Sequence, residues 1–172
     1  MATNLKEKEN YTINSSDFLI TKITMKNNKA IIECSNEDDF RTNDFKFKVK
    51  DEITENFKTL WDEVKDIIIA LTPSLYKEGQ ALKINSINFE YESGYLENVS
   101  IAVVWSIDDK GHILNLNYNK YPIFREEFTE DVVCISGKHE ELLHDILKAA
   151  KAYMKGDTRT KQMSLIVDNT KA

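Results

Sequence analysis

The sequence predicts one α+β domain: a mostly antiparallel β-sheet, made of a hairpin and a three-strand meander, with two amphipathic helices packed on one face. Three observations predict it. Apolar and polar residues alternate in several short segments, polar turns join these segments, and two longer segments carry apolar residues at spacings of three and four. The 172 residues suit one such domain, which we place at 17–156, between a flexible leader (1–16) and a flexible C-terminal tail (157–172).

A β-hairpin is expected to open the domain. Its first strand has four residues that share one parity: Leu19, Thr21, Ile23 and Met25. Residues 26–29 form a polar turn with two asparagines, which tolerate the positive φ of a tight hairpin. Residues 30–34 are expected to form the second strand of the hairpin. From 45 to 50, apolar residues alternate with lysines, which predicts an edge strand whose lysines discourage pairing with another sheet.

The first helix is expected after Asp51, which can cap it. Its apolar residues fall on one stripe: Ile53, Phe57, Leu60, Trp61, Val64, Ile67, Ile68 and Leu71. Spacings of three and four are typical of an amphipathic helix with one buried face. Thr72 ends this helix because the residue before a proline, here Pro73, disfavours helical geometry.

A β-meander and a second helix are expected to follow. The meander strands lie around 87–91, 99–107 and 114–118, and a hairpin turn at 108–111 joins the last two. Residues 132–135 suit a last short strand. Ser136 can cap the second helix, which should end just before Gly156. The buried stripe of this helix is expected to contain Leu142, Leu143, Ile146, Leu147, Ala150, Tyr153 and Met154.

Charge and composition exclude several classes of protein. The net charge of −6 and the pI near 5.2 argue against a broad, non-specific grip on nucleic-acid phosphates. Cys34 and Cys134 form no CxxC pair and suit small buried side chains rather than a disulfide framework. The N-terminus lacks the apolar segment of a signal peptide, and no apolar run is long enough to span a bilayer. We therefore expect a cytoplasmic protein.

No motif of catalysis or cofactor binding occurs. The sequence has no GxGxxG, no GxxxxGK[ST] and no GxSxG. His139 and His144 flank a helix segment like that of zinc proteases, but at five residues apart they differ by about 140° around the axis. We expect no metal, no cofactor and no enzyme, although one sequence leaves open an enzyme with an unrecognised site.

One short apolar segment interrupts the polar tail. It consists of Gln162, Met163, Ser164, Leu165 and Ile166. This segment resembles the pentapeptide Gln-Leu-Ser/Asp-Leu-Phe with which many bacterial proteins bind the DNA polymerase sliding clamp. Its first, third and fourth residues match, whereas methionine replaces leucine and isoleucine replaces phenylalanine. The resemblance implies that the glutamine amide forms a polar anchor and that the apolar side chains fill a pocket on the clamp. The alternative is that residues 165–167 add an edge strand to the sheet or pack on the chain's own domain.

A second resemblance covers the layout of the chain. The opening hairpin, the middle helix, the meander and the Lys/Ala-rich last helix with its Gln-x-x-Leu tail resemble small uncharacterised phage proteins of the replication and recombination region. The leading hypothesis is therefore a non-enzymatic phage accessory protein that docks on a host protein, the sliding clamp, through its tail. We expect no membrane partner, and the oligomeric state stays open.

An acidic surface offers an alternative function. The carboxylates that cluster outside the predicted helices and strands are Glu37, Asp38, Asp39, Glu126, Glu127 and Glu130. With these residues the chain would act as a decoy that inhibits a host defence enzyme or a nucleic-acid enzyme. A chain truncated after Gly156 separates the two hypotheses, because it should lose clamp binding but keep inhibition.

Overall fold

The fold is built on a single antiparallel β-sheet. The computed structural model describes residues 18–36, 43–75, 81–108 and 110–159. The elements are β1 (Leu19–Lys26), β2 (Lys29–Asn36), β3 (Asn43–Lys48), α1 (Glu55–Leu71), β4 (Leu82–Glu92), β5 (Tyr95–Ser106), β6 (Ile113–Pro122) and α2 (Lys138–Met154). The six strands lie in the order β3-β2-β1-β4-β5-β6, and every neighbouring pair is antiparallel.

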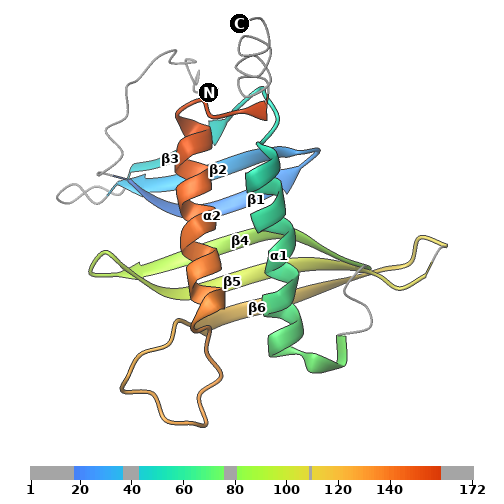
Figure 1. Ribbon diagram of the computed structural model, residues 1–172, viewed down its shortest axis with the longest axis vertical. Helices are drawn as coiled ribbons and strands as arrows, with labels where there is room; N and C mark the ends of the chain where they lie inside the picture. The colour runs from blue at the N-terminus through green and yellow to red at the C-terminus, as the bar shows by residue number, and fades with distance from the viewer. Residues whose placement is uncertain (1–17, 37–42, 76–80, 109, 160–172) are drawn as a thin grey trace, which may run out of the picture.

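Both helices cover the same face of the sheet, where they lie beside each other and cross the strands (Figure 1). One continuous cluster of buried side chains fills the space between the two layers. The helices contribute Phe57, Val64 and Ile68 from α1 and Leu143 and Ile146 from α2. This arrangement confirms the predicted α+β class and the two amphipathic helices on one face. The other face of the sheet carries no helix among the described residues.

The start of α1 differs from the prediction. Thr54, not Asp51, caps the helix: its side-chain oxygen accepts a hydrogen bond from the N–H of Phe57 at 3.1 Å. The backbone of Asp51 has another contact, because its carbonyl accepts a 2.6 Å hydrogen bond from the hydroxyl of Tyr153 near the end of α2. The side chain of Ile53 is buried between these points, so the chain reaches the core before the helix begins.

The start of α2 also differs from the prediction. Gly137 at φ 56° is the N-cap, and no side chain caps the helix. Ser136 therefore lies one residue before the cap, and its carbonyl accepts from the N–H of His139 at 3.3 Å. The expected strand at 132–135 is wrong, since only Ile135 pairs, in a single parallel bridge with Ile123.

The hairpin of β1 and β2 is confirmed, but the parity of β1 is only partly right. Asn27 and Asn28 have φ of 51° and 58°, as the tight turn requires. A register shift between residues 20 and 22 lets Ile20 and Ile23 both reach the core, whereas Leu19 is only partly buried. A bulge of this kind reverses the side-chain alternation for the rest of a strand.

The two edges of the sheet are β3 and β6. Lys46 and Lys48 are exposed on β3, as expected of an edge strand. Within the described ranges, no helix combines the length and the apolar character needed to cross a membrane.

Candidate partner-binding surfaces

The tail segment proposed to bind the sliding clamp, Gln162–Ile166, lies outside the described residues. Along the chain, contacts with the folded domain continue as far as Arg159. Thr158 is 3% exposed, and the N–H of Arg159 donates to the carbonyl of Glu52 at 3.1 Å. Packing thus continues three residues past the expected domain boundary at 156.

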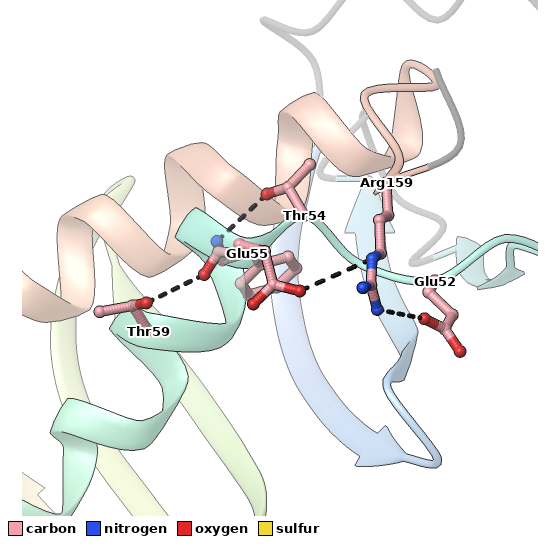
Figure 2. Close-up of polar contacts among 6 residues, drawn as sticks. Glu52, Thr54, Glu55, Thr59 and Arg159 are labelled. Carbon is pink, nitrogen blue, oxygen red and sulfur yellow. Dashed lines mark hydrogen bonds and ion pairs between the residues drawn. The ribbon is translucent and has the colours of Figure 1, made fainter. Parts of the chain in front are cut away.

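The Arg159 side chain lies against the start of α1 (Figure 2). Its guanidinium is 3.1 Å from the Glu52 carboxylate and 3.6 Å from that of Glu55. Gln162 follows three residues later, so at most about 10 Å of extended chain separates it from this contact. A partner that binds the tail at Gln162 must therefore also come close to the N-terminal end of α1.

The acidic residues proposed as a second site divide into two groups. Glu37, Asp38 and Asp39 lie outside the described residues. Glu126, Glu127 and Glu130 are all exposed in the loop between β6 and α2. The structure therefore supports an accessible acidic surface at the second group.

Backbone contacts hold this loop at its base. The N–H of Phe124 donates to the carbonyl of Ile135 at 2.8 Å, and the N–H of Ile135 donates to the carbonyl of Pro122 at 2.8 Å. Two turns inside the loop are closed at Phe128 and Val132, whose N–H groups donate to carbonyls three residues earlier. Because hydrogen bonds join the two ends of this loop, its side chains are held in a defined arrangement.

Arg125 ties the loop to the β4–β5 hairpin. Its guanidinium is 3.4 Å from the carboxylate of Glu92, 3.8 Å from that of Glu97 and 3.9 Å from that of Glu127. These partly exposed pairs contribute little stability individually. They do place the hairpin beside the loop, although the two segments are about 30 positions apart in the sequence.

The net charge of the chain is concentrated at this place. Residues 92–97 and 123–141 together contain eight carboxylates and two cationic side chains. Their net charge of −6 equals that of the whole chain, so the remaining residues are neutral in sum. A localised excess of one sign creates a strong local potential that attracts a partner of opposite charge.

Exposed apolar side chains lie among these carboxylates. Tyr95, Phe124, Val132 and Val133 are 77%, 48%, 38% and 61% exposed, which is half of the eight large apolar residues exposed in the described part of the chain. Tyr95 and Phe124 also line a hollow of about 520 Å³, together with residues that include Glu92, Arg125 and Glu140. We call residues 92–97 and 123–141 the acidic–apolar surface. Such mixed patches mark interaction sites.

The other reactive side chains give no catalytic arrangement in the described ranges. Burial raises the pKa of the Cys34 thiol to about 11, which keeps it protonated and inert. A side-chain hydrogen bond from His112 lowers the pKa of Asp108 in an exposed turn. Among the described residues, no group of three or more potential ligands gathers to hold a metal ion.

Sequence reasoning found three glutamates of this surface but missed its apolar half. Tyr95 directly follows a glycine at the start of β5, and Phe124 follows a proline by two positions. Aromatic residues close to a glycine and a proline, where packing does not require them, were the available indication. The link through Arg125 is tertiary and had no local pattern. A scan against family models and searches of curated proteins and of solved structures found no match to this chain.

Proposed function

We propose that this chain is a non-enzymatic accessory protein that binds the basic surface of another protein through its acidic–apolar surface. The observation that carries the proposal is that the whole net charge of −6 lies in residues 92–97 and 123–141, around four exposed apolar side chains. Proteins that bind nucleic acid have basic surfaces that match such a potential. The partner class is therefore an enzyme of nucleic-acid processing or of host defence, and the host would be the one that a phage infects.

The two components of the surface have different physical roles. The carboxylates accelerate encounter and select a basic partner, and salt screens this contribution. The apolar side chains supply area that is removed from water, at about 25 cal/mol per Å². Tyr95 and Phe124 are the natural anchors, since aromatic residues dominate the energetics of protein interfaces.

The test uses charge-neutral variants with a matched control. The first variant combines Glu126→Gln, Glu127→Gln and Glu130→Gln. The control combines Asp62→Asn, Glu63→Gln and Asp66→Asn, which removes the same charge from the exposed face of α1. A third variant combines Tyr95→Ser and Phe124→Ser. Each full-length protein is immobilised, and the proteins retained from a bacterial lysate are quantified by mass spectrometry.

The expected result is a partner that the wild type and the control variant retain, that both surface variants lose and that excess double-stranded DNA displaces. Retention of the same partner by all four proteins would overturn the proposal. The same holds for a partner that both charge variants lose equally, because that outcome indicates a general effect of net charge.

A second candidate function is docking on the sliding clamp through Gln162–Ile166. The observation that favours it is the match of Gln162, Ser164 and Leu165 to the clamp-binding pentapeptide, in a segment that begins three residues after Arg159. Deletion of residues 160–172 is expected to abolish clamp binding in surface plasmon resonance and to leave the lysate partner of the acidic–apolar surface in place. Because Thr158 and Arg159 belong to the folded body, this deletion is a cleaner test than truncation after Gly156.

A further inference from the structure

Among the described residues, no strand pairs with the outer side of β6, which we call its free edge, and a second group of exposed apolar side chains lies where this edge begins. Ile107, Ile113 and Leu114 are 52%, 58% and 43% exposed and lie where β5 passes into β6. β6 is the last of the six strands in the sheet and is ten residues long. This edge is separate from the acidic–apolar surface and is not explained by the proposed function.

Pairing with β5 determines which backbone groups of β6 point outward. The N–H of Ile107 donates to the carbonyl of His112 at 2.9 Å, and the register then runs from Ser106↔Ile113 to Ile101↔Tyr118 without a shift. In an antiparallel pair of strands, every second residue of one strand forms backbone hydrogen bonds with the neighbouring strand, and the residues between them point their N–H and C=O groups to the opposite side. The N–H and C=O groups of residues 113, 115 and 117 therefore point to the free edge, and their side chains lie on the face without helices.

The two edges of the sheet are protected to different degrees. β3 has six residues and carries Lys46 and Lys48, which oppose pairing with a second strand. From residue 113 to 119, β6 has no charged residue and no proline, and its first cationic side chain is Lys120 at φ 53°. The usual means of blocking an edge occur only at the far end of β6, where Lys120, Pro122 and the irregularity lie.

We propose that this chain forms a homodimer by antiparallel pairing of β6 with β6 of a second copy. A second copy is the fitting partner because its own residues 113–119 offer an uncharged edge of the same length. Pairing of β6 with β3 would bring lysines to the contact and would extend without closure, whereas two β6 edges close around a two-fold axis.

The outward groups define a specific register. Centring the pair on Asn115 places it opposite its own copy, Ile113 opposite Asn117, and Leu114 opposite Leu116. All three outward residues of each strand then exchange hydrogen bonds, and exposed Leu114 gains an apolar cross-strand neighbour. The product is a continuous sheet with the helices of both copies on one face.

Cross-linking tests the register. Residues opposite each other in a hydrogen-bonded pair have Cα atoms about 5.5 Å apart, within the range of a disulfide. In a Cys134→Ser background, where buried Cys34 remains, Asn115→Cys is expected to give a covalent dimer on oxidation with copper-phenanthroline. Lys46→Cys on the β3 edge should stay monomeric. Equal cross-linking of the two, or none at residue 115, would overturn the proposal.

Mass measurement tests the dimer itself. Light scattering of the full-length chain over a concentration series is expected to approach about 40 kDa, twice the 19.9 kDa of one chain. Asn115→Lys sets two like charges opposite each other and should return the mass to 19.9 kDa, while Asn85→Lys, an exposed position of β4, should not. A wild-type mass of 19.9 kDa at every concentration refutes the proposal, as does dissociation by both substitutions. Circular dichroism verifies that both variants are folded.

Discussion

Replacing Tyr153 with phenylalanine is expected to destabilise the fold by about 1–2 kcal/mol. Tyr153 is 1% exposed, and its hydroxyl donates to the carbonyl of Asp51 at 2.6 Å. Removal of the hydroxyl loses this bond and leaves a carbonyl without its donor in the junction between α1 and α2. Tyr153→Ala also removes the ring, which packs edge-on against Phe57 with 6.1 Å between the two ring centroids. The loss in free energy of unfolding should therefore rise to about 3–5 kcal/mol.

Urea unfolding followed by circular dichroism measures both values. The slope of the free energy against urea should be unchanged, which shows that the variants alter stability and not compactness. In a domain of this size each kcal/mol corresponds to about 2–4 °C in Tm. Tyr95→Phe is the matched control: Tyr95 is 77% exposed, so the change should stay within about 0.5 kcal/mol. If Tyr153→Phe is as stable as this control, the hydrogen bond to Asp51 does not support the helix junction.

Three further outcomes are expected. Ellman's reagent at pH 8 should modify only Cys134 in the native chain, since burial raises the pKa of Cys34 to about 11. In urea the reagent should modify both thiols. Two reactive thiols in the native chain would contradict the buried position of Cys34. Asn28→Ala should lose about 1 kcal/mol in thermal unfolding because its φ of 58° suits asparagine or glycine, whereas Asn28→Gly should not. Arg159→Ala should change stability by at most about 0.5 kcal/mol, because its carboxylate partners are 42% and 66% exposed, and a larger loss would mean that these pairs anchor the fold.

The sheet and both helices could be predicted because their patterns are local. The stripe from Phe57 to Ile68 and the alternation around Val103 each reflect one periodicity that packing preserves. The turn at Asn27 and Asn28 followed from their tolerance of positive φ, which the structure confirms.

The predictions of the helix caps and of the parity of β1 were wrong because tertiary contacts determine the local structure there. Asp51 and Ser136 are good capping residues, yet Thr54 and Gly137 occupy the cap positions because docking on the core fixes where each helix begins. The bulge near Thr21 changes the parity of β1 and cannot be inferred from alternation, which assumes a regular strand.

The acidic–apolar surface could be predicted only in part for the same reason. Glu126, Glu127 and Glu130 lie within five consecutive residues and form a visible cluster. Arg125 joins them to the β4–β5 hairpin through contacts between distant segments, which no local pattern encodes. The proposed clamp-binding segment stays a prediction, since it lies outside the described residues.

Amide hydrogen exchange of the full-length chain, alone and bound to the partner captured from lysate, tests the central claim most directly. Binding through the acidic–apolar surface predicts slower exchange in residues 92–97 and 123–141 and little change on the exposed face of α1. Protection confined to residues 160–172, or spread evenly over all acidic segments, would contradict it.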